Sequence, residues 1–385
     1  MNGITTHILT VEELTPAQVS AWTSFRNTNP ALYSPYFHVG YTQLLGGLCD
    51  DVHVLVVEQD AKPVAFLPFQ AKINSTGKVG FARPVGAPMT DYHGFICAVD
   101  TSFDARTVLK QAGFGAYHFS TLIDTGDMLA DYVRDVTPCA VMDISMGAED
   151  WRAARDSSYR RHLKSNRRRI RKAEELGARR FEFNSNDKAV FEQLMAWKRE
   201  KFSESGKYDV LDANWTSTLL KDLWEHGTNE HSSAELRTDM HALYFGDQLA
   251  AVDLGLSDGT TFHSWMVAYN NDFYNLAPGI QLLEALMDEA ANLGYARIDL
   301  GEGLDGYKRH YASEGIAVRS GFIAANGPAA ALSKLYGGLE KFGENKLGKV
   351  GRIPGKARRR YSQISACDAT LAGRSKAMIQ AVKNG

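Results

Sequence analysis

The chain has 385 residues, of which 44% are hydrophobic and 23% charged, and its formal net charge is −2. This composition excludes a disordered or fibrous protein, and the length indicates two domains of similar size. The positive charge is concentrated in two places: residues 159–180 carry ten Lys or Arg against two Glu, and residues 341–385 carry eleven against two acidic residues. Both segments are therefore candidates for contact with an anionic partner.

The opening residues, MNGITTHILT, lack the basic and apolar regions of a signal peptide, and no apolar run approaches the ~18 residues that span a bilayer. The four cysteines lie far apart, without a Cys-x-x-Cys pair or a histidine at ligand spacing. Neither a disulfide framework nor a metal site is expected. We expect a cytoplasmic protein, with peripheral attachment at the inner face of the membrane as a further option.

Residues 1–150 read as a β-rich, mixed N-terminal domain. Thr15 is placed to cap a first helix, with Pro16 at its first position. Alternating and apolar runs bounded by turn residues then predict strands, with one short helix between Phe103 and Gln111. The expected strands are 52–59, 63–71, 78–86, 116–123 and 139–146.

Residues 151–177 predict a basic connector helix, with Leu163 and Ile170 marking one apolar stripe and Gly177 ending it. Residues 178–340 predict a second mixed domain, followed by a basic tail over 341–385. The expected order in this second domain is one strand, two helices, a three-stranded meander, a helix, a strand, a short helix and a final strand pair. Their ranges are 179–184, 189–202, 213–227, 240–246, 248–256, 261–269, 278–293, 296–301, 305–312 and 317–325.

The stretch YNLAPGIQLL begins the helix expected from Pro278 to Leu293 with an unusual cap. Ala277 stands where Ser, Thr, Asp or Asn is favoured, because it has no side-chain oxygen to accept from the first turn. The backbone N–H groups of Gly279, Ile280 and Gln281 are then expected to stay available, and glycine lets a phosphate approach closely. The structural alternative is an ordinary proline helix start that needs no ligand.

The segment IDLGEGLDGYKRHY places Asp299, Glu302, Tyr307 and Lys308 at the carboxyl end of a strand and the start of the next helix. Ligands of open α/β sheets tend to bind at such ends. Asp299 has a structural alternative, as a strand-end carboxylate that caps a turn, and Lys308 has one as a solvated surface lysine.

Three motifs together carry a family resemblance: SSYRRHLKSNRRRIRKAEELG, NLAPGIQLLEALMDEA and IDLGEGLDGYKRHYA. The second half resembles the GNAT acyltransferase superfamily. The whole chain, over roughly residues 30–325, is similar to tandem-GNAT, FemAB/CelD-like proteins associated with bacterial exopolysaccharide (holdfast, cellulose) synthesis. The resemblance implies an α+β fold with two GNAT-like mixed-sheet domains in tandem, joined by the basic helix.

In GNAT enzymes the corresponding helix start holds the pyrophosphate of acetyl-CoA or another acyl-CoA. The resemblance thus assigns this role to Ala277, Pro278, Gly279, Ile280 and Gln281. The superfamily pattern carries a second Gly or Ala, whereas NLAPGI offers a single glycine at this turn.

The catalytic assignments follow the same resemblance. Tyr307 corresponds to the tyrosine that protonates the leaving thiolate, and Lys308 is expected to bind a coenzyme or acceptor phosphate. Acyl transfer also needs a base for the acceptor. His263 is the first choice and Asp253 the second, because both lie on central strands beside the expected cleft.

Candidate acceptor-binding residues come from both halves. Asp91, Tyr92 and His93, in GAPMTDYHGFI, lie in a turn that the resemblance places at an acceptor groove between the halves; the structural alternative is an ordinary turn. Arginine binds phosphate in a bidentate way, so the connector is a second candidate, with a solvated basic helix as its alternative. The residues expected there are Asn166, Arg167 and Arg168, with Glu302 added from the second domain.

The tail places Arg352, Lys356, Arg358, Arg359 and Arg360 in a short interval. This density suits an anionic membrane surface or a phosphorylated ligand such as a cyclic dinucleotide, and no DNA is expected. The alternative is a plain soluble extension.

These observations predict an N- or O-acyltransferase that moves an acetyl or other acyl group from acyl-CoA to a sugar of an exopolysaccharide precursor. The reaction is expected to need no metal, and the expected biological role is in biofilm formation. One alternative is a FemAB-like transferase that uses aminoacyl-tRNA. The other is a non-catalytic GNAT scaffold that binds a membrane or an anionic regulator.

Overall fold

The computed structural model describes residues 3–205, 208–227, 236–312 and 316–346, together with 360–361, 364–367, 374–375 and 378. The chain divides into two compact units that interleave along the sequence. Unit 1 consists of Met1–Thr137, Val210–Leu219 and Ala317–Gly385, and unit 2 of Pro138–Asp209 and Leu220–Ile316. The predicted domains, with boundaries at residues 150, 177 and 340, are contiguous along the sequence, whereas each unit combines separate segments. The domain boundaries stay a prediction.

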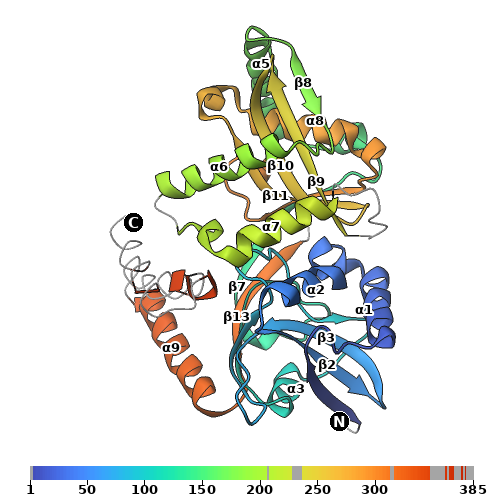
Figure 1. The fold of residues 1–385 in the computed structure, drawn as a ribbon, viewed down its shortest axis with the longest axis vertical. Coiled ribbons are helices and arrows are strands. Elements are labelled where there is room, and N and C mark those ends of the chain that lie inside the picture. The colour runs from blue at the N-terminus through green and yellow to red at the C-terminus, as the bar shows by residue number, and fades with distance from the viewer. Residues whose placement is uncertain are drawn as a thin grey trace. The chain divides into compact units, whose positions relative to one another are not determined.

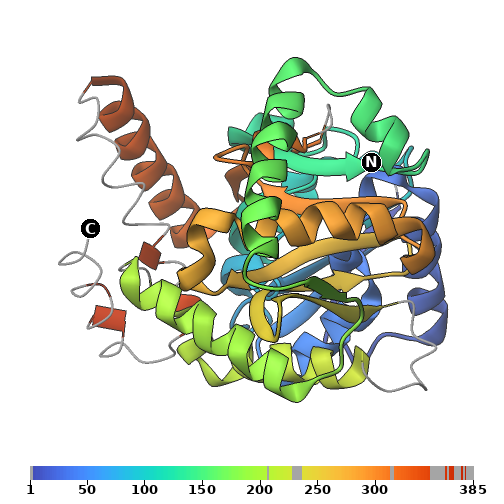
Figure 2. The same ribbon diagram turned by 90° about the horizontal axis from the view of Figure 1, so that it is seen from above.

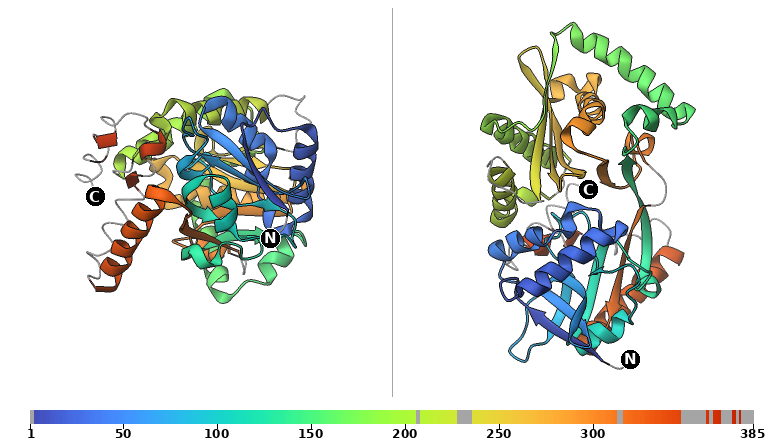
Figure 3. Two further views of the ribbon diagram at one scale, coloured as in Figure 1. Left: turned by 90° about the horizontal axis from the view of Figure 1, so that it is seen from below. Right: turned by 90° about the vertical axis from the view of Figure 1, so that its right-hand side faces the viewer.

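Unit 1 is built on a mixed sheet with the strand order β1-β2-β3-β4-β6-β13, and β5 pairs with β3. The predicted strands and the helix after Thr15 are present, whereas β1, α2 and α9 were not predicted. Helices α1 and α2 lie on one face of this sheet and α3 and α9 on the other (Figure 3). The elements are β1 (Ile4–Leu9), α1 (Pro16–Thr28), α2 (Val39–Leu48), β2 (Val52–Gln59), β3 (Lys62–Gln70), β4 (Val79–Pro84), β5 (Ile96–Cys97), α3 (Ala105–Gln111), β6 (Phe114–Leu122), β13 (Ala317–Ala324) and α9 (Gly327–Lys346).

Strand β3 shows why the unit 1 sheet is covered on both faces. Successive side chains of a strand point to opposite faces. Ala65, Leu67 and Phe69 pack in the cluster that includes α3, whereas Phe66 contacts the ring of Trp22 from α1 at a centroid distance of 5.2 Å. A continuous apolar run, rather than an alternating one, is what such a doubly buried strand requires.

Unit 2 contains the sheet β7-β12-β11-β10-β9-β8, and β7 (Val133–Asp143) carries the chain into it from unit 1. Helices α5 and α8 lie on one face of the sheet and α6 on the other (Figures 1 and 2). The predicted helix, meander, helix and strand order is confirmed as far as β12. The strand pair predicted at 317–325 is instead the single strand β13, which pairs with β6 in unit 1. The elements are α4 (Ala148–Ala153), α5 (Ser157–Glu174), β8 (Arg179–Glu182), α6 (Lys188–Glu204), β9 (Arg237–Phe245), β10 (Gln248–Ser257), β11 (Thr261–Tyr269), α8 (Pro278–Leu293) and β12 (Arg297–Glu302). Helix α7 (Asn214–Gly227) belongs to unit 1 as far as Leu219 and to unit 2 from Leu220.

Helix α8 has the predicted bounds and packs as its periodicity indicates. Leu283, Leu286, Met287 and Ala290 are buried in one cluster with Phe262 of β11. The helix ends at Gly294, whose φ of 85° is the left-handed conformation that glycine adopts without a steric penalty. The crossover from β11 through α8 to β12 gives the predicted parallel strand pair.

Two predictions about helices need correction. The basic helix α5 lies within unit 2 and buries Tyr159, Asn166 and Ala173 at seven-residue spacing, so it packs against the unit as well as carrying charge. The predicted short helix at 305–312 is only a 3-10 turn, Lys308–His310.

Candidate active site

Strands β11 and β12 pair over only three residues and then stop bonding to each other. The parallel pairs are Thr261↔Arg297, Phe262↔Ile298 and His263↔Asp299. Beyond them β11 continues to Tyr269, paired with β10, and β12 continues to Glu302, paired with β7. The second half of β11 therefore has an edge toward β12 that carries no strand pairing.

The N-terminus of α8 lies beside this unpaired half of β11. A Cβ atom built on Gly279 would meet Val267 and Tyr269 at 3.9 Å, which is ordinary van der Waals contact. Ala277, the residue before the helix, is in the left-handed conformation with φ 50° and ψ 58° and makes no side-chain cap bond. The missing side-chain cap predicted from the sequence is thus confirmed.

The supply of N–H groups at this helix start is smaller than predicted. Ile280 N and Gln281 N both donate to the carbonyl of Ala277, at 3.1 and 3.2 Å. The buried Gln281 side chain donates to Leu276 O at 3.0 Å and accepts from Arg179 at 3.3 Å. Of the three N–H groups expected to be available to a ligand, only that of Gly279 does not donate to the Ala277 carbonyl.

Asp253 of β10 is a buried carboxylate in a polar cluster. Ser264 Oγ donates to Asp253 Oδ2 at 2.8 Å, while Oδ1 is buried without a hydrogen-bond partner among the described residues. Burial raises the pKa of Asp253 to about 6, and the Ser264 hydrogen bond and the nearby Lys198 ammonium partly oppose this shift. At neutral pH the group is an ionised carboxylate that is more basic than an ordinary aspartate.

Tyr307 lies at the start of the 3-10 turn after β12 and keeps 37% of its surface exposed. Burial of the rest raises its pKa to about 12, with further contributions from the Asp253 carboxylate and the Tyr269 phenol. Its phenol is therefore protonated at neutral pH and electrostatically coupled to Asp253. Asp253 lies on β10 and Tyr307 in the loop that follows β12.

His263 and Asp299, both predicted to be catalytic, lie beside each other where β11 and β12 pair, and their catalytic roles stay predictions. Both side chains are fully buried, with His263 Nδ1 at 3.6 Å from Asp299 Oδ2. Asp299 Oδ1 also accepts from Gly301 N at 2.8 Å, which is the turn-capping alternative considered for it. Asp253 and His263 are both buried, so burial does not choose between them, and the catalytic role predicted for His263 stays a prediction. We take Asp253 as the candidate base because its carboxylate contributes to the raised pKa of Tyr307.

Glu302 and Lys308 lie at the other side of the strand end. Lys308 Nζ donates to the backbone carbonyl of Glu302 at 3.2 Å, and the Glu302 side chain is exposed. Lys308 is half-buried, so its ammonium is held near the end of β12. Their predicted ligand contacts stay predictions.

Glu284 of α8 is the centre of a hydrogen-bonded network that the sequence analysis did not identify. Its carboxylate is mostly buried and accepts from Arg152 Nη2 at 2.9 Å, Tyr159 OH at 3.1 Å and Tyr311 OH at 2.7 Å. The Tyr311 ring in turn meets Tyr307 edge-on at 6.2 Å. The network fixes α4, α5 and the Tyr307 loop to α8, and its partners come from segments too distant in sequence for periodicity to reveal.

The Asp91-Tyr92-His93 motif lies in unit 1, where Tyr92 and His93 are buried. Tyr92 packs edge-on against Tyr33 and Tyr36. Both ring nitrogens of His93 are buried without a hydrogen-bond partner among the described residues, and burial lowers its pKa to about 3. Tyr92 and His93 thus pack inside the structure rather than at a surface where a soluble acceptor would meet them, and the motif's role stays a prediction.

Helix α5 presents a dense basic surface, with one correction to the predicted residues. Asn166 is buried, so it is not on this surface, whereas Arg167 and Arg168 are exposed. The exposed basic residues of α5, called the α5 basic face below, are Arg160, Arg161, Lys164, Arg167, Arg168, Arg171 and Lys172.

Three further findings concern metals, membranes and the tail. No group of three or more His, Cys, Asp or Glu side chains within the described ranges could hold a metal ion. None of the helices in the described part of the chain is both long and apolar enough to cross a membrane. Of the predicted tail residues, Arg360 is described, and Arg352, Lys356, Arg358 and Arg359 lie outside the described residues.

Comparison with known proteins places a GNAT domain over this site. Residues 160–309 match the family model described as acetyltransferase (GNAT) domain. This range begins in α5 and ends just after Tyr307, so it contains Asp253, Ser264 and the start of α8. No curated protein matches the sequence.

Solved structures show the fold. The structure of FemX covers 82% of this chain and 96% of its own, at 10% identity and a TM-score of 0.50. A tandem GNAT protein from the clavulanic acid biosynthesis pathway covers 83% and 97%, at 11% identity and a TM-score of 0.44. The C-terminal domain of a putative lysylphosphatidylglycerol synthetase from Agrobacterium fabrum covers 82% and 94%, at 12% identity and a TM-score of 0.44. The fold is mixed α/β and GNAT-like, and residues 160–309 are similar to an acetyltransferase (GNAT) domain.

Proposed function

We propose that unit 2 transfers an acetyl or other acyl group from a coenzyme A thioester to an amine or hydroxyl of a sugar, in a precursor of an exopolysaccharide. The observation that carries the transfer is the end of the β11–β12 pairing beside the start of α8. The buried Asp253 carboxylate lies on the neighbouring strand β10 and contributes to the raised pKa of the partly exposed Tyr307. The match of residues 160–309 to the GNAT domain supports the same site.

The residues present fit an acyl-CoA, though with fewer contacts than expected. Gly279 lies beside β11 and offers one N–H at the positive end of the α8 dipole, where a pyrophosphate is stabilised. The unpaired edge of β11 offers backbone groups to an extended chain such as pantetheine. Lys308, held near the end of β12, is the basic side chain we assign to a coenzyme phosphate.

The chemistry follows from the two pKa shifts. The acceptor nitrogen or oxygen attacks the thioester carbonyl and gives its proton to the Asp253 carboxylate, whose raised pKa makes it a stronger base. The carbon–sulfur bond breaks, and the departing sulfur takes the proton of the Tyr307 phenol, which is protonated at neutral pH. The positions of Ser264 and Lys198 keep Asp253 oriented and largely ionised above pH 6.

The acceptor assignment rests on charge and on the family resemblance. A lipid-diphosphate-linked or otherwise phosphorylated sugar is anionic, and the α5 basic face offers arginines suited to bidentate phosphate binding. We assign Arg167 and Arg168 to this contact. Charge reversal of both should raise the KM for a phosphorylated acceptor while leaving the KM for acyl-CoA unchanged.

The test is an acyl-transfer assay with a panel of coenzyme A thioesters and paired acceptors, one amino sugar and the corresponding hydroxyl sugar, each free and diphosphate-linked. Mass spectrometry should find an acylated sugar with equimolar free thiol. Binding of every thioester without any transfer would reject the acceptor class. Failure of every thioester to bind would reject the donor.

The FemAB-like alternative is favoured by the α5 basic face, whose seven exposed basic residues also suit RNA phosphates. The fold likeness to FemX is compatible with it. Filter binding with aminoacyl-tRNA separates the two functions, because an aminoacyl-tRNA-dependent enzyme would bind charged tRNA and give no calorimetric signal with acetyl-CoA. For the scaffold alternative, thioester cleavage would be the same in wild type and in Tyr307→Phe.

A further inference from the structure

Helix α9 carries an exposed apolar stripe that the proposed function does not use. Leu332, Leu335, Tyr336, Leu339 and Phe342 follow one another at helical spacing, and each is between 36% and 64% exposed. Monomeric soluble proteins seldom expose so many large apolar side chains side by side unless the patch binds something. We call these five residues the α9 stripe.

The α9 stripe is not a misplaced core face, because the opposite face of α9 is fixed to unit 1. Ala329, Ala330 and Ser333 are buried against the sheet. Arg134 Nη1 donates to Gly337 O at 3.1 Å and lies 3.5 Å from Glu340 Oε2. A Cβ on Gly337 would collide with the Arg134 guanidinium, so Arg134 lies directly against this face of the helix.

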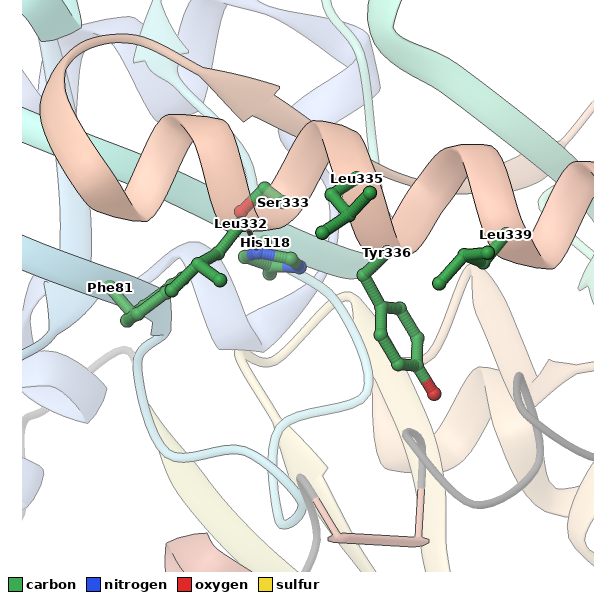
Figure 4. Close-up of a pocket in the computed structure, with 7 residues that line it drawn as sticks. All are labelled: Phe81, His118, Leu332, Ser333, Leu335, Tyr336 and Leu339. Atoms are coloured by element: carbon green, nitrogen blue, oxygen red, sulfur yellow. Dashed lines mark hydrogen bonds between the residues drawn. The ribbon is translucent and has the colours of Figure 1, made fainter.

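A groove of about 280 Å³ runs along the stripe, between α9 and the strands β4 and β6. Figure 4 shows its lining side chains, which are Phe81, His118, Leu332, Ser333, Leu335, Tyr336 and Leu339. His118 Nε2 and Ser333 Oγ are hydrogen-bonded to each other at 2.9 Å. A small-molecule site usually offers a few polar groups that orient the ligand, and this pair is already engaged, so the groove favours an apolar occupant without fixed orientation.

Positive charge accompanies the apolar stripe. Lys334 and Lys341 are exposed on α9 itself. The sequence from Lys341 to the end then carries eleven basic residues against Glu344 and Asp368. Apolar side chains on one face of a helix, combined with clustered Lys and Arg, are the combination that binds the interface of an anionic bilayer.

The same charge argues against a second copy of this chain as the occupant. A symmetric dimer would place the same patch of both subunits in contact. It would bring Lys334 and Lys341 of one copy toward those of the other, and like charges brought together oppose association. An anionic lipid surface instead satisfies both the apolar stripe and the charge.

We infer that the α9 stripe is a membrane-docking surface that inserts into the headgroup region of an anionic phospholipid bilayer. Leu335 and Phe342, the two most exposed members at 64% and 61%, are its inserting residues. Lys334 and Lys341 contact the headgroups.

The test is co-sedimentation of the full chain with vesicles of phosphatidylcholine alone or of an equal mixture with phosphatidylglycerol. The wild type should sediment with the mixed vesicles and much less with phosphatidylcholine alone. Leu335→Ser with Phe342→Ser should lower the vesicle partition coefficient at least tenfold. Lys334→Glu with Lys341→Glu should lower it about fivefold per lysine at low salt, and less at high salt.

Leu176→Ser is the matched control, because Leu176 is a leucine of unit 2 that is 53% exposed. It should sediment like the wild type. The inference is overturned if the wild type ignores anionic vesicles, if Leu176→Ser loses binding equally, or if sedimentation velocity shows a dimer that the double serine variant dissociates. None of these readouts depends on acyl transfer.

Discussion

The clusters around Asp253 in unit 2 and around His93 in unit 1 both bury titratable side chains, yet their environments differ. Asp253 accepts from Ser264, lies near Lys198 and is coupled to the partly exposed Tyr307. His93 has no hydrogen-bond partner for either ring nitrogen among the described residues, and its pKa falls to about 3. The first environment brings a basic carboxylate to a partly exposed phenol, whereas the second holds a neutral imidazole among tyrosine rings. Burial alone therefore does not mark a catalytic residue; burial together with an accessible proton partner does.

The largest expected effect is that of Asp253→Asn. Loss of a general base should lower kcat by about 10²- to 10³-fold with little change in the KM for acyl-CoA. The folded-state pKa of about 6 lies above the ordinary 3.8, so ionisation of Asp253 opposes folding and stability falls as pH rises from about 4 to above 6.

At pH 7.5 the free energy of unfolding of Asp253→Asn should therefore exceed that of the wild type by about 1–2 kcal/mol, measured by denaturant unfolding. Ser264→Ala serves as the companion variant, because it removes the hydrogen bond and keeps the carboxylate. An Asp253→Asn protein that retains activity would contradict the role of Asp253 as a base. One that loses both activity and stability would contradict the claim that ionisation of Asp253 opposes folding.

Tyr307→Phe is expected to lower kcat by about 10- to 100-fold, because the departing thiolate loses its proton donor while the ring stays in place. Tyr274→Phe is a suitable control, since Tyr274 is also exposed and carries no assigned role. Steady-state thiol release measures both. Equal activity of the Tyr307 and Tyr274 variants would remove Tyr307 from the mechanism.

The pH dependence sharpens the same comparison. Log kcat/KM should decline by about one unit per pH unit below about pH 6, as Asp253 is protonated, and should be flat from pH 6 to neutrality. The residual activity of Asp253→Asn should lack this acid limb. Because the pKa of His93 lies near 3, His93→Leu should leave the limb unchanged.

His93→Leu tests the unit 1 side of the comparison. Replacing an imidazole whose nitrogens are buried without partners should raise the free energy of unfolding by about 1 kcal/mol, as measured by urea denaturation. The KM for the acceptor should not change. A several-fold rise in that KM with unchanged stability would restore His93 as an acceptor-binding residue and contradict the contrast drawn above.

The sequence predicts most elements of unit 2 because its signals are local. Pro278 and Gly294 bound α8, and the alternating runs with tight turns give β9 to β11. The sequence could not distinguish the surroundings of His263 and Asp253, because their neighbours, Asp299 for His263 and Ser264 for Asp253, come from other strands. The left-handed backbone of Ala277, which turns its carbonyl toward Ile280 and Gln281, is likewise a tertiary feature.

Other features depend on contacts between distant segments. The sequence alone does not distinguish Glu284 from a solvated glutamate, because its partners Arg152 and Tyr311 are distant in the chain. The apolar spacing of the α9 stripe is also typical of a core face. The contacts of Arg134 with Gly337 show that the opposite side of the helix is the one held against unit 1. In both cases the residue pattern is visible in the sequence, and the partner that gives it meaning is not.

The most direct test of the acyl-CoA site is calorimetric titration of acetyl-CoA into wild type, Ala277→Asp and Ala277→Gly. Aspartate tolerates the left-handed conformation and places a carboxylate at the α8 N-terminus, whereas glycine keeps the backbone and adds no charge. We predict binding by the wild type, equal affinity in Ala277→Gly and about 3- to 10-fold weaker binding in Ala277→Asp. The absence of heat with the wild type, or equal affinity in all three proteins, would contradict the assignment of this helix start to a coenzyme pyrophosphate.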